Sequence, residues 1–490
     1  MPVRYVYGVI GLLTVAALYG CWCRVPLIWD GAYQFNATLI MQRPYFFLTR
    51  FHTFFLWYPT VWASRHTANM ALLQSLFGLP FLLAPVAGLL LSWWMVRKDA
   101  PWLILWVAFG VCAATLPGQI FVINDSIFQQ HLFWPIFVGM FVPLSMPKKI
   151  VIALLCVFQF PHQLGMLLFL GAAIATALVA KADAPNRRRL LVRSAILFGL
   201  FILALAKIVV TNHIPALYDS YAAQEANFRT AMDRWKWGVA GWPIAGLCFV
   251  YASAVFAYRQ RRRICRGQGD KTVGLSVLSL LCMGIGALCW VYWAADGRLW
   301  WKALDYRRWV GPLSAPFFIM AAMEVFRCAR RRETPETCRD DNAPPLREPL
   351  VLLLAATFAL IIGIQSHIWK EETDQLMQSL AGYGGTVMPS VEIKEWADLT
   401  PLDHWGTADF VVARQGKTPM KLLLDPRAEQ LIYAKPPTVP HADMYADPKD
   451  PTPGPAGYFD FHPLLKKLSH DRFHGPRGGP ERLDIRSTPN

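Results

Sequence analysis

The sequence predicts an all-α polytopic membrane bundle with a small extracytoplasmic α/β domain at its C-terminal end. Of the 490 residues, 54% are hydrophobic, and many apolar runs reach the roughly 20 residues that a helix needs to cross a hydrocarbon core. Short basic clusters between these runs hold the excess positive charge, because acidic residues slightly outnumber basic ones from Glu371 onward. This distribution follows the positive-inside rule, so we do not expect the net charge of +15 to bind nucleic acid.

About eleven apolar segments are expected to cross the membrane, with the N-terminus in the cytoplasm. The N-terminal segment does not resemble a cleaved signal peptide, because it has a single Arg4 and bulky residues where a cleavage site would lie. The expected segments are residues 5–23, 72–96, 101–118, 131–146, 150–160, 163–181, 190–210, 239–258, 272–293, 309–326 and 349–366. Basic clusters then all face the cytoplasm: Arg97-Lys98, Lys148-Lys149, Arg187–Arg189, Arg261–Arg263 and Arg330–Arg332.

The stretch Ile150–Ala180 is long enough for one helix, but its flanks favour two. Lys148-Lys149 and Arg187–Arg189 lie on either side of it, and both clusters should face the cytoplasm. Two short helices separated at Pro161-His162 satisfy this requirement, and proline supplies the break. We therefore expect a broken hairpin here.

The long connection 24–71 is expected to face outward and to hold an interfacial helix over residues 44–63. Arg50 and His52 lie at the centre of that segment and Pro59 near its end, which argues against a membrane crossing. Its many aromatic residues are typical of a helix that lies in the membrane–water interface.

The chain changes character after the last apolar segment. Residues 367–435 mix charged residues with short strand-like runs at Phe410–Ala413, Lys421–Leu424 and Gln430–Tyr433. This pattern favours a small α/β domain outside the membrane. A tail rich in Pro and Gly follows over 436–490, and its composition is that of a disordered or surface-bound segment.

Acids and histidines gather in the first two outward connections. The most informative of them is Asp30, a few residues after the first apolar segment, because a carboxylate at this depth is costly unless it is hydrated, paired or used in chemistry. For each acid the alternative is a helix-capping or turn-capping role. The first connection holds Asp30, Arg43, Arg50 and His52, and the second holds Asp125, Gln129 and His131.

This arrangement resembles the glycosyltransferase C superfamily (GT-C). The resemblance lies in a first helix that runs outward, Asp30 shortly after it, a long first outer loop with an interfacial helix, and Asp125 in a short second loop. It covers the membrane domain, residues 1–366, and the outer C-terminal domain. Many members carry a second acid beside the first-loop Asp, where this sequence has Gly31. The resemblance implies transfer of a sugar from a polyprenyl-phosphate donor to an acceptor hydroxyl at the outer face, with inversion.

The chemistry of that reaction gives the candidate residues their roles. Displacing a phosphate from an anomeric carbon requires a base for the acceptor hydroxyl, and Asp30 is the candidate. Under the resemblance, Asp125 would bind sugar or acceptor hydroxyls, or hold a divalent cation such as Mg or Mn. The candidates for substrate binding are Arg43, Arg50, His52, Gln129, His131, His162, Trp301, Arg307 and Arg308.

The connection 294–308 is basic although it is expected to face outward. Arg307 and Arg308 at a helix entrance suit the leaving phosphate, and Trp301 suits the face of a sugar. An ordinary membrane anchor of aromatic and cationic residues is the alternative. For His162, in the break between two helices, the alternative is a structural histidine.

The sequence therefore predicts a glycosyltransferase of the bacterial inner membrane, with its C-terminal domain in the periplasm. Its partners would be the lipid-linked donor, a glycan or lipid acceptor, and membrane lipids. A transporter or flippase of a lipid-linked glycan is the first rival, although transporters usually place polar sites at the bilayer midplane between repeats. Another membrane transferase, such as a glycan ligase, a polymerase or an acyltransferase, is the second. The ten cysteines precede residue 340 and lack the spacing of a zinc site.

Overall fold

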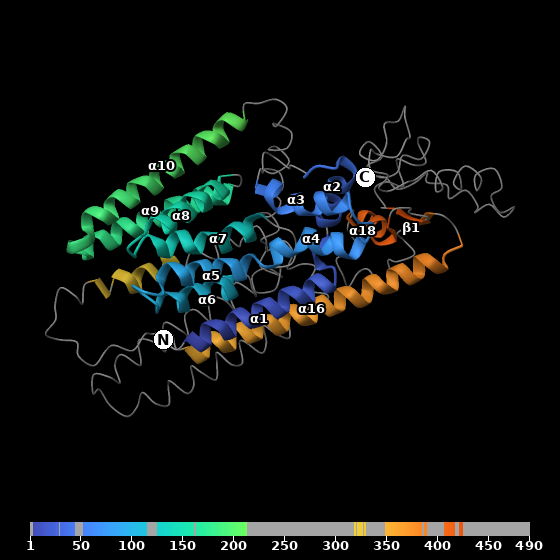
Figure 1. Cartoon of the computed structure of the whole chain (residues 1–490), viewed down its shortest axis with the longest axis horizontal. Helices are drawn as coiled ribbons and strands as arrows, with labels where there is room; N and C mark the ends of the chain where they lie inside the picture. Colours follow the sequence, from blue (N-terminus) through green and yellow to red (C-terminus); the bar gives the residue numbers. More distant parts are fainter. Residues whose placement is uncertain are drawn as a thin grey trace, which may run out of the picture.

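A computed structural model gives the fold of the chain, and the part that it describes is mostly helical (Figure 1). The described residues are 3–28, 30–44, 52–114, 125–160, 163–212, 318–319, 321–326, 328–329, 348–384, 387–389, 406–416 and 421–424. The predicted segments 239–258 and 272–293 and the tail 436–490 lie outside them.

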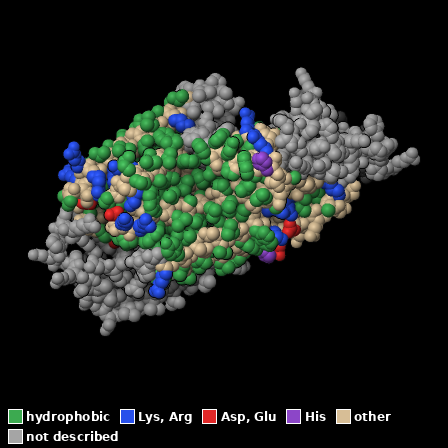
Figure 2. Space-filling model, in the orientation of Figure 1, with side chains coloured by type: hydrophobic (Ala, Val, Ile, Leu, Met, Phe, Trp, Pro, Cys, Tyr) green, Lys and Arg blue, Asp and Glu red, His purple; other side chains and the backbone are tan. Residues whose placement is uncertain are grey.

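Four described helices are long and apolar enough to cross a membrane, and a bent pair makes a fifth when it is counted as one span. The pair is α4 (Met70–Leu82) with α5 (Ala84–Val96). In Figure 2, hydrophobic side chains cover the middle of the visible face, whereas charged side chains lie mostly toward its ends. The chain is therefore a membrane protein. The four long helices are α1 (Val3–Trp22), α9 (Gln163–Ala182), α10 (Arg187–Asn212) and α16 (Glu348–Gly382).

The remaining described elements are shorter. They are the 3-10 turns η1 (Val25–Leu27) and η3 (Ala184–Asn186), and the helices α2 (Asp30–Met41), α3 (His52–Ser64), α6 (Leu103–Ala114), α7 (Asp125–Gly139), α8 (Met146–Gln159) and α18 (Gly406–Gln415). Two strands, β1 (Val387–Pro389) and β2 (Leu422–Leu424), pair in parallel.

One end of the helical bundle is basic, and four helices meet there. Lys148, in the first turn of α8, donates to the Met95 carbonyl at the end of α5 over 2.6 Å. Arg193, in the second turn of α10, donates to three carbonyls at the end of α7. The starts of α8 and α10 therefore lie beside the ends of α5 and α7, and we call this region the basic end.

The opposite end, called the distal end below, holds the start of α7 and the end of α8. Gln129 of α7 donates to the carbonyls of Phe158 and Gln159 over 3.2 and 3.3 Å. Phe55 of α3 contacts Phe158, with ring centroids 5.8 Å apart, so α3 lies there too. In Figure 1, α2, α3, α4 and α18 gather toward this end.

The predicted break within Ile150–Ala180 is confirmed. Helix α8 ends at Gln159 and α9 begins at Gln163. Lys207, near the distal end of α10, donates to the Phe160 carbonyl over 3.0 Å, so α8 ends there. Helix α9 returns to the basic end, where α10 begins. The intervening residues Pro161 and His162 lie outside the described residues.

The predicted span 72–96 is not one straight helix. It divides at Leu83 into α4 and α5, which are bent by 45°. The bend has a local cause, because Pro85 has no N–H for the carbonyl of Phe81 four residues earlier, and its ring clashes with that carbonyl.

Other helix boundaries differ from the prediction as well: α7 ends at Gly139 and not at 146, and α8 begins at Met146 and not at 150. Helix α7 begins at Asp125, so Asp125 and Gln129 lie in a helix and not in an outer loop. Helix α16 continues past residue 366 to Gly382. At about 1.5 Å per residue its 35 residues extend for about 52 Å, which exceeds a hydrocarbon core of roughly 30 Å. The charged stretch that begins at Lys370 therefore lies beyond the membrane-spanning part of α16.

The C-terminal segment holds one wrong strand prediction and one confirmed one. Residues Phe410–Ala413 belong to helix α18, because packing inside the protein overrides the strand propensity of Phe and Val. The strand predicted at 421–424 is β2, in register with β1 through Val387 and Leu422. The run Gln430–Tyr433 lies outside the described residues.

Candidate distal site

Three of the predicted site residues are the first residues of helices. Asp30 begins α2, His52 begins α3 and Asp125 begins α7. A helix start favours a carboxylate, because the unpaired N–H groups of the first turn and the helix dipole both stabilise negative charge. The structure describes the backbone of these three residues but not their side chains. The positions of Asp30 and Asp125 therefore fit a helix-capping role and a catalytic role equally well.

Contacts between aromatic rings connect these helices at the distal end. Phe81 of α4 lies against Phe128 of α7, with ring centroids 5.2 Å apart. Trp57 of α3 stacks on Phe77 of α4 at 4.9 Å, and Phe77 in turn meets Phe35 of α2. The aromatic contacts thus extend from α2 through α4 and α3 to α7.

Four buried polar residues lie near the start of α7 and the end of α8, and their side chains point in different directions. Gln129, Gln130 and His131 follow Asp125 on α7, and Gln159 lies at the end of α8; all four are fully buried. Gln129 and Gln159 pair reciprocally, since each side-chain amide donates to the backbone carbonyl of the other over 3.3 Å. We call these four residues the distal polar cluster.

Many polar atoms of these four residues have no hydrogen-bond partner among the described residues. Both amide atoms of Gln130 and both ring nitrogens of His131 lack one, as do the side-chain oxygens of Gln129 and Gln159. An unsatisfied buried polar atom costs about 1–3 kcal/mol, and most buried polar groups in native proteins are satisfied by protein or ordered water. Ordered water or polar groups outside the described residues can supply partners for these atoms.

The backbone at His131 also departs from an ordinary helix. Pro135, four residues later in α7, has no N–H to donate to the His131 carbonyl. Gly88 of α5 lies directly beside that carbonyl. A Cβ at this position would lie 2.3 Å from the carbonyl oxygen. The close approach of α5 to α7 at this point therefore requires glycine.

Of the other predicted site residues, the structure describes Arg43 but not the remaining five. Arg43 follows α2 and is exposed. No group of three or more His, Cys, Asp or Glu side chains that suits a metal ion occurs among the described residues. The remaining candidates lie outside the described residues: Arg50, His162, Trp301, Arg307 and Arg308.

Two members of the cluster, Gln130 and Gln159, were not among the residues predicted from the sequence. Both interrupt apolar helices, and a glutamine in such a position is a signal that the sequence does carry. Gln159 gives a further sign, because it lies just before the predicted break at Pro161.

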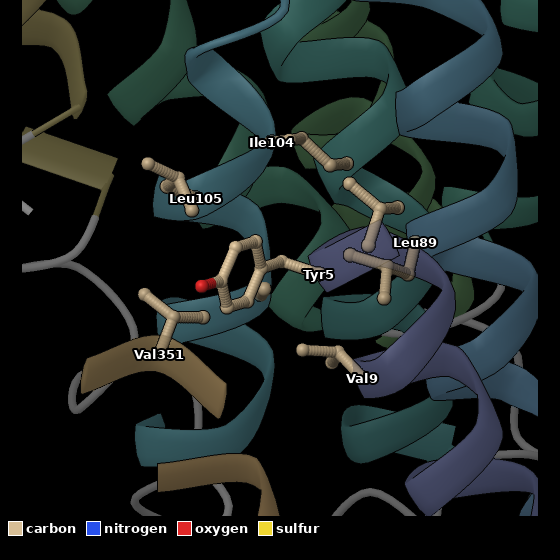
Figure 3. Close-up of a pocket in the computed structure, with 8 residues that line it drawn as sticks. Tyr5, Val9, Leu89, Ile104, Leu105 and Val351 are labelled. Carbon is tan, nitrogen blue, oxygen red and sulfur yellow. The ribbon is translucent and has the colours of Figure 1, made fainter. Parts of the chain in front are cut away.

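A small apolar pocket lies away from the cluster, between α1, α5, α6 and α16 (Figure 3). Tyr5, Leu89, Ile104 and Val351 line it, and the hydroxyl of Tyr5 is the polar group that Figure 3 shows there. This lining offers little to a sugar or a phosphate, so it does not compete with the distal polar cluster as a candidate site.

Comparison with known proteins does not identify a family. No family model, no curated protein and no solved structure matches the chain.

Proposed function

We propose that the chain is a membrane glycosyltransferase that moves a sugar from a polyprenyl-phosphate donor to an acceptor hydroxyl, with inversion, at the distal end. The observation that carries the proposal is the distal polar cluster, where the Gln130 amide, the His131 ring and the side-chain oxygens of Gln129 and Gln159 have no partner among the described residues. Each amide offers donors and an acceptor, the combination that sugar hydroxyl groups need. Asp125 precedes Gln129 by one helical turn, so both residues lie on the same face of α7.

In the proposed reaction, one residue acts on the bond that forms and others act on the bond that breaks. Asp30 takes the proton of the acceptor hydroxyl while its oxygen bonds to the anomeric carbon. The bond from the anomeric carbon to the phosphate oxygen breaks, and the polyprenyl phosphate leaves with the electron pair. Arg307 and Arg308 are assigned to that phosphate, and Asp125 is assigned to hydroxyls or to a divalent cation.

The proposal includes the finer membrane arrangement. Eleven spans, a cytoplasmic N-terminus and an outward distal end would bring the site to the periplasmic face of a bacterial inner membrane. The clustering of Lys148 and Arg193 at the basic end supports this orientation, because basic residues favour the cytoplasmic side. Residues 367–435 would form an α/β domain on the periplasmic side, and the exposed aromatic residues Phe55 and Trp62 of α3 would lie in the outer interface.

The central experiment compares purified wild-type protein with Asp30→Asn for sugar transfer from polyprenyl-phosphate donors. We expect transfer to fall by about 100-fold or more in the variant, because general base catalysis contributes roughly 10²–10⁴-fold. Equal turnover would remove Asp30 from the base role. Translocation of the lipid by the wild type without transfer would favour the flippase.

A second pair of variants tests the cluster. Gln130→Met keeps the side-chain volume but removes the unpaired amide, so we expect an unchanged or higher melting temperature and roughly tenfold slower transfer. Gln74→Met is a comparison for stability alone, because the Gln74 side-chain nitrogen donates to the Ala413 carbonyl at 3.0 Å. It should lower the melting temperature. Unchanged transfer in Gln130→Met would remove the cluster from the substrate site.

A further inference from the structure

The C-terminal segment reaches the distal end through a buried helix. In α18 the four consecutive residues Phe410, Val411, Val412 and Ala413 are at most 3% exposed. Successive residues of a helix are about 100° apart, so four of them point to all sides. Other elements therefore enclose α18, and it packs most extensively against α2, the helix that begins at Asp30.

Two contacts fix the neighbours of α18. The side-chain amide of Gln74, in α4, donates to the Ala413 carbonyl over 3.0 Å. The ring of Trp369, in α16, meets Phe410 edge to face with centroids 5.3 Å apart. Helix α18 therefore lies among α2, α4 and α16, although hundreds of residues separate it in sequence from α2 and α4.

Charged groups hold the end of α18 on α16. Arg414 and Lys370 both pair with the Asp374 carboxylate, over 2.9 and 2.8 Å. The Arg414 side chain is largely buried, at 15% exposed, which makes its ion pair stronger than one in open solvent.

Lys421, which follows α18, also binds the C-terminal segment to the end of α16. Its ammonium donates to the carbonyls of Leu380 and Ala381 over 2.8 Å and to the carbonyl of Tyr383. These are carbonyls at the end of α16, which have no partner within the helix. Gln415 closes the connection between α18 and Lys421, because its amide bonds both the N–H and the carbonyl of Lys421.

We propose that α18 is a positioning element of the distal site, which holds α2 and with it the backbone at Asp30. On the buried side of α2, Ala32, Phe35 and Leu39 are completely covered. Arg414 is the positioning residue that holds α18 in place. The mechanical part of this proposal is independent of the reaction, whereas its consequence for catalysis rests on the proposed function.

Hydrogen–deuterium exchange of the full chain in lipid nanodiscs tests the mechanical part. Arg414→Met removes the pair with Asp374, and we expect amides of Asp30–Met41 to exchange about tenfold faster. Peptides of α7 and α10 should exchange as in the wild type, and Arg414→Lys should restore slow exchange in α2. Gln74→Met, which removes the bond to Ala413, should have the same effect as Arg414→Met. Unchanged exchange in α2 in both variants would overturn the proposal.

Kinetics then test the consequence for catalysis. Arg414→Met should lower kcat about tenfold with little change in the KM for the donor, and Arg414→Lys should recover most of it. The exposed residue Arg188, at the basic end, supplies the control Arg188→Met, which should change neither value. Faster exchange in α2 with unchanged kcat would overturn the positioning role. Faster exchange of α2 in Arg414→Met, together with a wild-type chain that transfers no sugar, would instead contradict the proposed function and leave the mechanical part standing.

Discussion

At the scale of single residues, close contacts between helices at the distal end depend on glycine. Gly88→Ala should destabilise the protein by about 1–3 kcal/mol, because its Cβ would lie 2.3 Å from the backbone oxygen of His131. Thermal unfolding in detergent measures the change. Gly171→Ala is the matched control in α9, where an added Cβ meets nothing within 4 Å, and it should be neutral or stabilising. Equal melting temperatures in the two variants would contradict the close approach.

Glu372 should make the stability of the chain depend on pH. Burial, and then repulsion by Glu371, raise the pKa of Glu372 from 4.5 to about 7. The folded chain therefore binds this proton more tightly than the unfolded chain, so the free energy of unfolding falls as pH rises from about 4.5 to about 7. Melting temperatures between pH 5 and pH 8 should show this decline.

Glu372→Gln should flatten that decline and raise the melting temperature at pH 8. Glu371→Gln is the control, because Glu371 is largely exposed and pairs with His367 at 3.1 Å. It should keep most of the decline and reduce it only by removing the repulsion. An unaltered pH profile in Glu372→Gln would show that another group titrates in this range.

The sequence could indicate which residue types matter at the distal end but not how they are arranged. Gln129 and His131 were predicted from their place beside Asp125, and the structure shows them buried. The bonds from Gln129 to α8 and the close approach of α5 to the His131 carbonyl join residues far apart in the chain, so they could not be predicted. The function of Asp30 stays a prediction at this scale.

At the scale of secondary structure elements, cationic side chains cap the ends of several helices. Lys148 caps α5, Arg193 caps α7, Lys207 caps α8 and Lys421 caps α16. The last carbonyls of a helix have no internal partner, and a cation there is favoured by the helix dipole. Where such carbonyls lie inside the membrane they also lack water, so a donor from a neighbouring helix joins the two helices.

Arg193→Met should show the size of this effect. It leaves the carbonyls of Gly139, Met140 and Val142 without their donor, and we expect a loss of about 2–4 kcal/mol in the free energy of unfolding. Thermal unfolding provides the measurement. Arg188→Met, at an exposed position on the same helix, should change the stability by less than about 0.5 kcal/mol. Similar losses in the two variants would contradict the capping role.

Elements were predictable where their signal is local. The break before α9 follows from Pro161 and the flanking basic clusters, and it was predicted. The bend at Leu83 also has a local cause in Pro85, but a continuous apolar run concealed it. Helix α18 was misassigned because its four apolar residues fit a strand or a buried helix equally well, and only the contact with α2 decides between them.

At the scale of the whole molecule, basic residues gather at one end of the helical bundle, and the proposed direction of the chain through the membrane depends on them. The four helices that meet at the basic end bring Lys148 and Arg193 together, and the exposed Lys98 follows the end of α5 in the same region. The grouping of Lys98 with Lys148 was predicted from the order of charges along the sequence, whereas Arg193 was in none of the predicted clusters. The length of α16 beyond the membrane was not predictable in the same way, because it depends on contacts with Phe410 and Lys421 from the C-terminal segment.

Labelling of single introduced cysteines in intact cells should reveal this direction. Arg65 follows α3 toward the distal end, Lys98 follows α5 at the basic end, and both are exposed. We expect Arg65→Cys to react with a membrane-impermeant maleimide without permeabilisation, and Lys98→Cys only after it, because basic clusters favour the cytoplasmic side. Wild-type protein supplies the background, since its described cysteines are buried or half-buried. The opposite labelling pattern would reverse the chain in the membrane and remove the distal end from the periplasmic face, where a periplasmic acceptor would have to reach Asp30.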